Sequence, residues 1–579
     1  MIERMPKRRC AYFRDDQIAC LVTHQTNEIS EDQLRGLLAA LKPHLKGGEV
    51  DWPPRMISFP AVTAEQYRKW LARLQRVPPV QAEGEEAPGP SPEPLFDAIS
   101  MLVCNVKNGP KDPLEQIDTI QTLGKQFQEP IAGLTVQSIT PNWLISGASQ
   151  GGATGGPGGL PKPFKTENSD PVQVPYRFEA LKTLLNEKGL CGEGENVDVA
   201  ILDTAPCGHD LVMAYKEWNA HPLINTLLGP DGKLCLYPAT YKELLRMGNT
   251  SMNRHDYQMT DHGLFAAGII HSIVPEAKIH LIEVLNPFGV GDLESLTGGL
   301  LKVLLDIYKP ETNRRLVVNC SWMLELPLVI EHCYAPFPTD PDYGFEQAVW
   351  KMIQDDPNPI ETKRQAFWLK ALCDRLGVLG AQVVAAAGND WSHAKEEHKA
   401  QGGTQKKKNN GQAEEPRGTA PAARYPAALN EVIGVGALPP NSKDSHSGKY
   451  RVSEYSNLGD KPAGLGIMTL GGEEGKDNNG KEKGVLGLYL GEKFPGKIPN
   501  QAEMTIFGRG NDEKNPWAWW EGTSFATPVL TGTIAAVLSI LPDPSSMTQD
   551  AVKALYDNSI IERDGTDAKE DVMETVQDY

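Results

Sequence analysis

Hydrophobic positions from residue 197 to residue 437 fall into short continuous runs separated by longer amphipathic stretches. A short apolar run without polar alternation predicts a strand buried on both faces, and its alternation with helical patterns predicts a mostly parallel sheet. Helices cover both faces of such a sheet, which gives a three-layer α/β fold. Ligand sites of these folds lie outside the carboxyl ends of the strands. Functional side chains are therefore expected directly after the apolar runs.

The first 145 residues carry a different pattern, in which strand-like and helical stretches are interleaved. This order predicts a smaller α+β domain of the ferredoxin-like type. An acidic, proline-rich stretch over residues 81–94 divides it and is typical of a flexible linker. The predicted strands cover 18–22, 56–59, 99–106 and 134–139, and the predicted helices cover 31–41, 64–74 and 113–127.

A glycine- and proline-rich segment over residues 146–173 separates the two patterns. Segments of this composition predict a flexible, protease-accessible linker. The chain therefore divides into an N-terminal region (1–145), this linker and a main domain (174–579). Within the main domain, two polar stretches rich in glycine or charge predict surface insertions at 395–424 and 470–515.

Composition narrows the classes of function. The net charge of −18, from 57 basic and 75 acidic residues, predicts a surface that repels nucleic acid. The N-terminus lacks the uninterrupted apolar region of a secretory signal, and the apolar stretch after residue 524 is better explained as a core helix than as a membrane span. Nine cysteines without a CxxC pair predict reduced thiols and no zinc site. These features predict a cytoplasmic protein that binds neither nucleic acid nor membrane.

Residues 520–541 read WEGTSFATPVLTGTIAAVLSIL, in which a Gly-Thr-Ser turn runs into a long apolar helix. A serine in the first turn of a buried helix lies near unpaired backbone N–H groups and the positive end of the helix dipole, which stabilise an oxyanion. Ser524 is therefore a candidate nucleophile. Pro528 is expected in the same first turn, where its missing N–H costs little. Gly532 predicts a close approach of this helix to another element.

A serine hydroxyl becomes an effective nucleophile only when a base accepts its proton and a third group orients that base. Upstream, the apolar run VDVAILD ends in Asp203, and the stretch DHGLFAAGII places His262 at the start of a short helix. Another run, VVAAAGND, carries Asn389 at its end, and this amide can donate to an oxyanion. The order along the chain is Asp203, His262, Asn389 and Ser524.

These four segments, VAILDT, HGLFAAG, VVAAAGN and GTSFATP, resemble the four signature segments of the subtilisin-like serine proteases, the subtilase family, in the same order. The resemblance implies a subtilisin-like fold and a serine endopeptidase that cleaves protein or peptide substrates. It implies that Asp203 orients the imidazole of His262, that His262 acts as general base and then acid, and that Ser524 is acylated. Asn389 and the backbone N–H of Ser524 would form the oxyanion hole.

Two of the segments depart from the family's usual sequence. Ala205 stands where glycine usually follows Asp-Thr, and Gly263, Leu264 and Phe265 replace the usual Gly-Thr-His. These positions shape and pack the site without transferring protons, so changed specificity is expected. They also leave open a second hypothesis, in which the chain is a catalytically inactive scaffold that binds peptides or regulates a partner.

By the same resemblance, further segments bind the substrate. A loop with two glycines flanks the bound peptide, and the segment after the strand at 316–320 pairs with the peptide backbone. The side chain of Trp322 has an alternative role, which is to pack into the core. The predicted substrate-binding residues are Gly289, Gly291, Ser321, Trp322, Met323, Ala387 and Gly388.

The resemblance also implies a role for the N-terminal region, because subtilases commonly carry a small α/β prodomain at this place. The region is then the intramolecular inhibitor of a zymogen, with residues 136–144 as a tail in the active-site cleft and a cut between residue 144 and about residue 160. The alternative is a permanently attached recognition or regulatory domain. No cofactor is implied. Calcium occurs in many subtilases, but no segment has the spacing of a calcium loop, so no metal ligand is predicted.

Overall fold

The structure is a computed structural model of the 579-residue chain. Apart from isolated positions between the ranges, it describes residues 13–26, 28–74, 96–109, 129–147, 161–163, 178–206, 261–286, 289–308, 312–324, 367–389, 423–444, 447–459, 466–476, 483–490, 517–543, 546–563 and 571–573.

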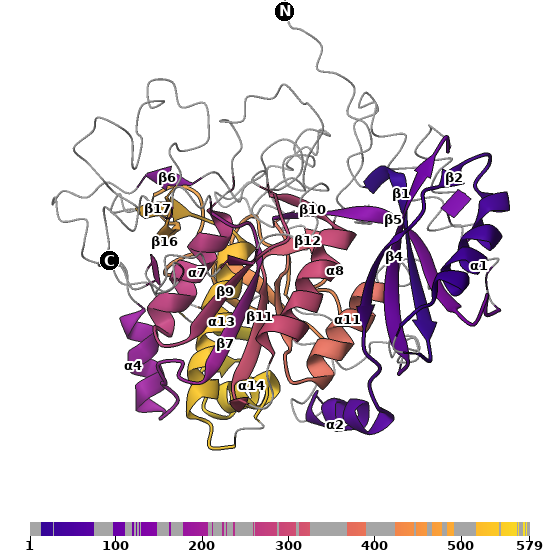
Figure 1. The fold of residues 1–579 in the computed structure, drawn as a ribbon. Coiled ribbons are helices and arrows are strands. Elements are labelled where there is room, and N and C mark those ends of the chain that lie inside the picture. The colour runs from indigo at the N-terminus through magenta and orange to yellow at the C-terminus, as the bar shows by residue number, and fades with distance from the viewer. Residues whose placement is uncertain are drawn as a thin grey trace, which may run out of the picture.

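Among the described residues, a nine-stranded sheet forms the centre of the main domain (Figure 1). Its neighbouring strands run parallel, except for the antiparallel pair β18 and β19 at one end. Helices cover both faces, so the predicted α/β fold is confirmed. In spatial order the strands are β18 (Ile561–Glu562), β19 (Asp571–Met573), β15 (Gly466–Leu470), β14 (Ile433–Leu438), β13 (Val383–Ala386), β11 (Arg315–Cys320), β7 (Val197–Asp203), β9 (Lys278–Glu283) and β8 (Leu236–Tyr237).

Strand β7 shows why the sheet is buried on both faces. Val197, Val199 and Ile201 belong to one hydrophobic core, whereas Ala200 and Leu202 belong to a second core. Successive side chains of a strand point to opposite faces, so an uninterrupted apolar run supplies both cores. The first core is completed by α4 (Glu179–Glu187), α7 (His262–Ile273), α13 (Thr523–Ile540) and α14 (Thr548–Asp557), and the second by α8 (Leu293–Lys302) and α11 (Phe367–Val378).

Helix α13 runs through the first core. Among the described residues it is the one helix long and apolar enough to cross a membrane, and 89% of this stretch is buried inside the protein. It is therefore a core helix. The close approach that Gly532 predicts is present, because a Cβ at this position would lie 3.0 Å from the Cδ1 atom of Ile273 on α7.

The C-terminal end of α13 is bound by a side chain from the central sheet. Arg315, the first residue of β11, donates to the carbonyl oxygens of Leu538 (2.5 Å), Leu541 (2.6 Å) and Asp543 (2.9 Å). The last carbonyls of a helix have no intrahelical donor, and a cation there also opposes the negative end of the helix dipole. Arg315 thus fixes the end of α13 relative to the sheet.

The N-terminal domain is built on an antiparallel sheet with the strand order β5, β1, β4, β3. Helix α1 packs on one face, and its first turn carries a reciprocal capping box between Ser30 and Gln33. The small α+β domain predicted from the sequence is confirmed. Its elements are β1 (Phe13–His24), α1 (Glu31–Leu41), a 3₁₀ turn (Lys42–His44), β2 (Glu49–Val50), β3 (Arg55–Phe59), α2 (Ala64–Leu74), β4 (Ala98–Lys107) and β5 (Thr135–Gly147).

The two domains share a core and a strand. The face of the N-terminal sheet opposite α1 contributes Leu21, Phe59 and Met101 to the second core of the main domain. Strand β5 leaves the N-terminal sheet and pairs with two short strands of the main domain, β10 (Val290–Asp292) and β12 (Trp322–Leu324). One sheet therefore runs from the N-terminal domain into the main domain.

A small antiparallel sheet lies near the start of α13. Strands β16 (Val485–Leu488), β17 (Trp517–Trp520) and β6 (Lys162–Pro163) form a small antiparallel sheet, and β17 leads directly into the Gly-Thr-Ser turn. A π-helical turn (Val303–Ile307) continues α8. Strand β16 lies within the segment 470–515, which the sequence predicts to be an insertion.

Helix predictions in the N-terminal region agree closely with the structure, since α1 and α2 have the bounds predicted for them. The last predicted strand, 134–139, is too short, because β5 continues to Gly147. Most of the predicted helix at 113–127, of both predicted linkers and of the insertion at 395–424 lies outside the described residues.

The contact between Arg315 and α13 can be tested by Arg315→Gln. Because three carbonyl groups lose a charged donor, we expect the free energy of unfolding of the main domain to fall by about 1–3 kcal/mol in denaturant titrations. Lys553→Ala, which removes an exposed ion pair with Asp557, should change it by less than about 0.5 kcal/mol. Equal effects of the two substitutions would contradict the capping role of Arg315.

Candidate active site

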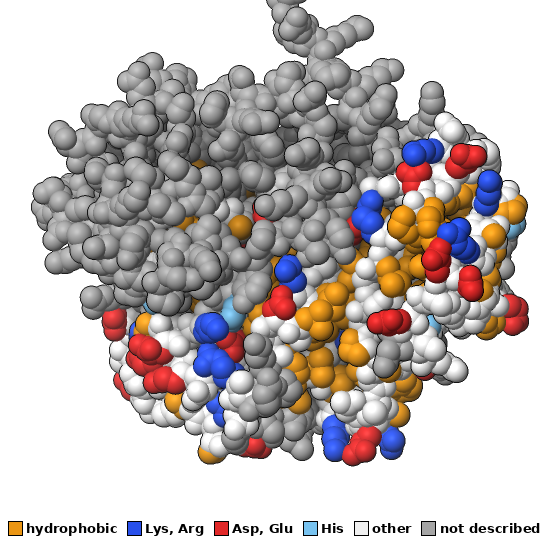
Figure 2. All heavy atoms as spheres, in the orientation of Figure 1, with side chains coloured by type: hydrophobic (Ala, Val, Ile, Leu, Met, Phe, Trp, Pro, Cys, Tyr) orange, Lys and Arg blue, Asp and Glu red, His pale blue; other side chains and the backbone are white. Residues whose placement is uncertain are grey.

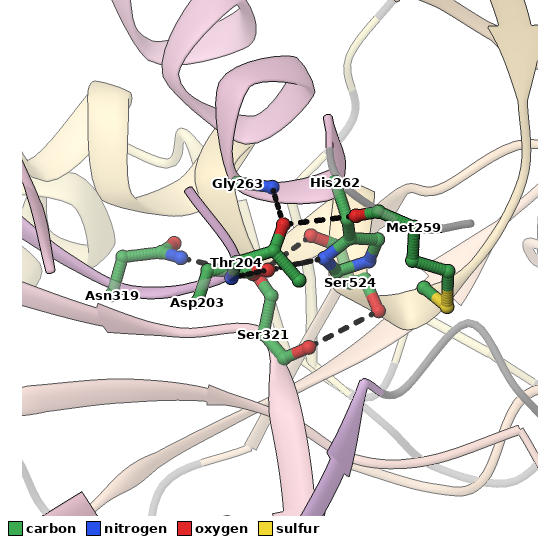
Figure 3. Close-up of polar contacts among 8 residues, drawn as sticks. All are labelled: Asp203, Thr204, Met259, His262, Gly263, Asn319, Ser321 and Ser524. Carbon is green, nitrogen blue, oxygen red and sulfur yellow. Dashed lines mark hydrogen bonds and ion pairs between the residues drawn. The ribbon is translucent and has the colours of Figure 1, made fainter. Parts of the chain in front are cut away.

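Four predicted site residues come together at the carboxyl ends of the central strands. Asp203 is the last residue of β7, and Asn389 follows the end of β13 by three residues. His262 opens α7, and Ser524 is the second residue of α13. All four residues are fully buried. In Figure 3 the imidazole of His262 lies between the carboxylate of Asp203 and the side chain of Ser524.

The contact between Asp203 and His262 fixes the proton on the imidazole. Nδ1 of His262 lies 2.7 Å from Oδ1 and 2.9 Å from Oδ2 of Asp203. The backbone N–H of Thr204 donates to the same Oδ1 at 2.6 Å. A carboxylate accepts hydrogen bonds and does not donate them, so Nδ1 carries the proton. The neutral ring therefore presents Nε2 as a hydrogen-bond acceptor.

Thr204 holds the two elements that carry this pair. Its hydroxyl donates to the carbonyl oxygen of Met259 at 2.9 Å and accepts from the backbone N–H of Gly263 at 3.1 Å (Figure 3). Gly263 has no room for a side chain, because a Cβ would lie 2.3 Å from the carbonyl oxygen of Thr204 and 3.0 Å from the Cβ of Asp203. Glycine at this position thus allows α7 to approach the end of β7.

An aromatic cluster surrounds the ring of His262. Trp520 lies edge-on to it at a centroid distance of 5.4 Å, and Phe525 is tilted against it at 5.2 Å. Phe265, one of the departures from the usual subtilase sequence, packs on Phe525 at 4.6 Å and on Trp520 at 5.5 Å. Such contacts orient aromatic rings and exclude water. Phe265 has space because Gly487 of β16 has no side chain: a Cβ there would lie 2.6 Å from the Phe265 ring.

The backbone carbonyl of Ser524 accepts a hydrogen bond from outside its helix, because Pro528 has no N–H to donate to it. The expectation that Pro528 lies in the first turn is wrong: it is the sixth residue of α13 and lies in the second turn. Its missing N–H would be the helical donor to the carbonyl of Ser524, four residues earlier. The hydroxyl of Ser321 supplies this donor instead, at 2.8 Å. In return, the hydroxyl of Ser524 donates to the carbonyl oxygen of Ser321 at 3.4 Å (Figure 3).

A buried polar chain fixes Ser321 in turn. Nδ2 of Asn319 donates to the Ser321 hydroxyl at 3.0 Å, and Oδ1 of Asn319 accepts from the hydroxyl of Thr531 at 3.0 Å. All three residues are fully buried. Because each hydroxyl or amide in this chain has a partner, the chain connects β11 to α13 without leaving a polar group unpaired.

Asn389 is oriented by the residue before Ser524. Its Oδ1 accepts from the backbone N–H and from the hydroxyl of Thr523, both at 3.0 Å. A backbone N–H only donates, so the atom facing it must be the carbonyl oxygen of the side-chain amide. Nδ2 of Asn389 is therefore turned away from Thr523 as a donor.

Two buried polar atoms of these residues have no hydrogen-bond partner within the described part of the chain: Nε2 of His262 and Nδ2 of Asn389. One is an acceptor and the other is a donor. Their side chains contact Phe525 and Thr523, the two neighbours of Ser524 in sequence. Unpaired buried polar atoms are rare and indicate either strain or a group that waits for a partner. The site thus offers an acceptor for the Ser524 proton and a donor for a developing negative charge.

The end of β5 lies beside the segment that contacts Ser524. Its last four residues, 144–147, pair antiparallel with β10 on one side and with β12 on the other. At the end of this pairing Gly147 lies opposite Trp322, and the residue before Trp322 is Ser321, which contacts Ser524. A peptide strand is therefore already bound beside Ser524, and it belongs to the protein's own N-terminal domain.

Four of the predicted substrate-binding residues lie along this strand or at its edge. Gly291 and Met323 pair with residues 145 and 146 of β5, and Gly289, at φ 75°, ends the turn that leads into β10. The backbone of Trp322 pairs with Gly147 of β5, and its side chain is 1% exposed and belongs to the second core. The core-packing alternative therefore describes its indole.

Two other predicted substrate-binding residues, Ala387 and Gly388, directly precede Asn389 in the chain. Gly388 has φ 114°, and a Cβ there would lie 2.8 Å from Nδ2 of Asn457, so only glycine suits this position. Its N–H donates to the hydroxyl of Thr523 at 3.2 Å. The backbone of Ala387 is bound on both sides, by Val435 and by Arg424. Gly388 and Asn389 thus bind the same hydroxyl, that of Thr523.

Sequence reasoning missed the polar chain through Asn319 and Thr531. A signal for it exists, since Thr523, Thr527 and Thr531 recur every four residues in an otherwise apolar helix, which places them on one face. Two of these hydroxyls hold Asn389 and Asn319. The partners lie more than 130 residues away in sequence, so the helix alone does not reveal them.

The described residues offer no obvious metal site. Among them, no group of three or more His, Cys, Asp or Glu side chains is placed to hold a metal ion. The buried carboxylate of Glu473 accepts from Arg451 at 2.7 Å and lies 3.4 Å from Lys483, so basic side chains neutralise it. A calcium ion is therefore not assigned to any of these residues.

Comparison with known families decides the relationship. The sequence model of the subtilase family matches residues 194–574, which is more than half of the chain and includes all four site residues. The chain belongs to the subtilase family. Its members are serine peptidases, so the chain is assigned to the serine peptidases as well. No curated protein matches the sequence.

Three solved structures that are similar to this subtilase are described as proteases or as an enzyme related to subtilisin. Fervidolysin from Fervidobacterium pennivorans, a keratinolytic enzyme related to subtilisin, is 16% identical with a TM-score of 0.40, and the match covers 95% of this chain and 58% of that one. A lanthipeptide protease is 18% identical (TM-score 0.33; 62% and 79% covered), and a cold-adapted subtilisin-like serine proteinase is 14% identical (TM-score 0.32; 66% and 90% covered). The chain thus spans less than two thirds of the length of fervidolysin.

The link between Ser321 and Pro528 can be tested by a double-mutant cycle. Ser321→Ala leaves the buried carbonyl of Ser524 without a donor, so we expect the free energy of unfolding to fall by about 1–3 kcal/mol. Pro528→Ala restores a backbone N–H in the position that bonds to this carbonyl. In the double variant, Pro528→Ala should therefore recover part of the loss, as measured by denaturant titration.

Thr533→Val is the matched control, because its hydroxyl bonds within α13 to the carbonyl of Val529. Combined with Pro528→Ala it should give additive changes. Additivity of Ser321→Ala with Pro528→Ala would show that Ser321 does not replace the missing helical donor.

Proposed function

We propose that this subtilase is an endopeptidase that hydrolyses peptide bonds through an acyl-enzyme on Ser524. The observation that supports this most directly concerns two buried atoms, Nε2 of His262 and Nδ2 of Asn389, which have no hydrogen-bond partner among the residues that the structure describes. They are the acceptor and the donor that acyl transfer requires: one takes the proton of the nucleophile, and the other stabilises the oxyanion.

In the proposed reaction, a rotation about the Cα–Cβ bond of Ser524 turns its hydroxyl from the carbonyl of Ser321 toward Nε2 of His262. Nε2 accepts the proton as Oγ bonds to the carbonyl carbon of the substrate. Asp203 stabilises the imidazolium that forms, and Asn389 with the backbone N–H of Ser524 binds the oxyanion. The imidazolium then protonates the leaving amine, and water repeats the sequence on the acyl-enzyme.

We also propose that the N-terminal region inhibits the enzyme within the same chain. Residues 144–147 occupy the edges of β10 and β12, which an extended substrate would need for its own backbone pairing. This strand ends at Gly147, beside the residue that contacts Ser524. The expected cut therefore narrows to the bonds between residue 147 and about residue 160, and the enzyme would be made as a zymogen.

The alternative is an inactive scaffold with the same fold, and the departures in the sequence motivate it. Phe265 packs on aromatic neighbours and leaves the bonds between Asp203 and His262 formed. This departure therefore gives no support to a loss of catalysis.

Covalent labelling tests the proposal. The protein should react with a fluorophosphonate probe on Ser524, as located by peptide mapping, and mass spectrometry should detect a cut between residues 147 and 160. Ser524→Ala should abolish both, and His262→Ala should lower the labelling rate by about 10⁴-fold or more, because the base and nucleophile act as a unit.

Ser539→Ala, on the same helix, is the control and should label at the original rate, since its hydroxyl bonds to Ala536 away from the site. A folded sample whose linker is cut and whose tail is displaced, yet which does not react with the probe, would support the inactive scaffold.

A further inference from the structure

We propose that α11 and α14 form a docking surface for α2, separate from the active-site cleft, and that this surface keeps the N-terminal domain bound as a subunit once the chain is cut. The inference rests on the proposed function only for the origin of the cut. The N-terminal domain would then stay attached after activation and would not be lost.

Helix α2 is an addition to the N-terminal fold. A ferredoxin-like β-α-β-β-α-β order joins its second and third strands directly. Here the strands in those places are β3 and β4, and α2 is inserted between them. The helix lies below the N-terminal sheet, against α11 and close to α14 (Figure 1). Helix α2 thus extends from its own domain and packs on the main domain, and we call it the anchor of the N-terminal domain.

Two aromatic residues of α2 are buried against the main domain. Trp70 is 1% exposed and Tyr67 is 8% exposed, and they form one cluster with Val62 and with Val378 of α11. The indole of Trp70 lies over Gly377, where a Cβ would be only 2.4 Å from the ring. Gly377 thus opens a place on α11 that the indole fills. A buried aromatic side chain in a fitted pocket is typical of the residues that dominate binding energy.

A buried arginine of α11 binds both chain segments that flank α2. Arg375 is 2% exposed and donates to the carbonyl of Pro60 at 3.3 Å and to the carbonyl of Asp97. Burial lowers its pKa to about 10, so it remains charged at neutral pH. Pro60 follows β3, and Asp97 precedes β4. The main domain therefore holds the entry and the exit of the insertion as well as the helix.

A third contact lies between the cleft and this anchor. Arg55 of β3 forms two hydrogen bonds with the carboxylate of Glu294 on α8, at 2.5 and 2.8 Å, and Glu294 is fully buried. Breaking a buried ion pair is costly because it leaves the carboxylate of Glu294 without this cation, so the pair opposes separation.

Figure 2 shows hydrophobic side chains gathered along the junction of the two domains.

The strand in the cleft is held in a different way. Residues 144–147 bind through backbone pairing to β10 and β12, which a substrate strand can replace bond for bond. None of the contacts of α2 depends on that pairing. After a cut beyond residue 147, the tail can leave the cleft while the rest of the N-terminal domain stays on the main domain.

The experiment uses the full chain with Ser524→Ala and a recognition sequence for an added, sequence-specific protease in place of residues 150–157. The cut is then independent of the chain's own activity, so failure of the proposed function would not affect the result. After cleavage, size-exclusion chromatography in native buffer should show the two fragments eluting together, and denaturant should separate them. Separation in native buffer at micromolar concentration would overturn the inference.

Substitutions in α2 test which contact is responsible. Trp70→Ala should raise the dissociation rate of the cut N-terminal fragment at least about tenfold, and Lys69→Ala, whose side chain is 72% exposed on the same helix, should leave it unchanged. Gly377→Leu, which is made on the other fragment, should raise the dissociation rate as Trp70→Ala does, because a side chain there would meet the Trp70 ring. This variant keeps the test possible if Trp70→Ala does not fold. Unchanged rates in folded Trp70→Ala or Gly377→Leu would show that α2 is not the anchor.

Discussion

The contact between Asp203 and His262 is the interaction on which the arrangement of the site depends. Two ionisable groups buried together are costly unless each finds good hydrogen bonds, and here the carboxylate receives both the imidazole and a backbone N–H. The contact requires α7 to approach β7 closely, which Gly263 permits and Thr204 maintains. Its chemical result is that Nδ1 holds the proton and Nε2 is left as an acceptor.

The start of α13 has to be placed as accurately as the imidazole. Ser321 takes the helical position that Pro528 leaves empty, and Asn389 binds the first N–H of the helix. Arg315 binds the far end. The helix that carries Ser524 is therefore fixed at both ends by residues that follow or begin central strands. These supports fix the backbone from which the side chain of Ser524 projects, while the surrounding core remains apolar.

The sequence was sufficient for features that depend on local chemistry. Strand runs ending in Asp203 and Asn389, and a Gly-Thr-Ser turn before an apolar helix, identify candidate residues without any knowledge of their contacts. Features that depend on distant contacts were not accessible. The position of Pro528 was predicted wrongly because its reason for being there is Ser321, about 200 residues away. Helix α2 was predicted with the correct bounds, but its packing on α11 could not be read from its own residues.

The most direct test of the account is the location of the proton on the His262 imidazole. Nitrogen-15 NMR of the chain labelled only in histidine, with His262 assigned by substitution, reports this for each ring nitrogen. The account predicts a protonated Nδ1 and an unprotonated Nε2 in the neutral ring, and a loss of this preference in Asp203→Asn. A neutral His262 with its proton on Nε2 would contradict it, because such a ring cannot accept the proton of Ser524.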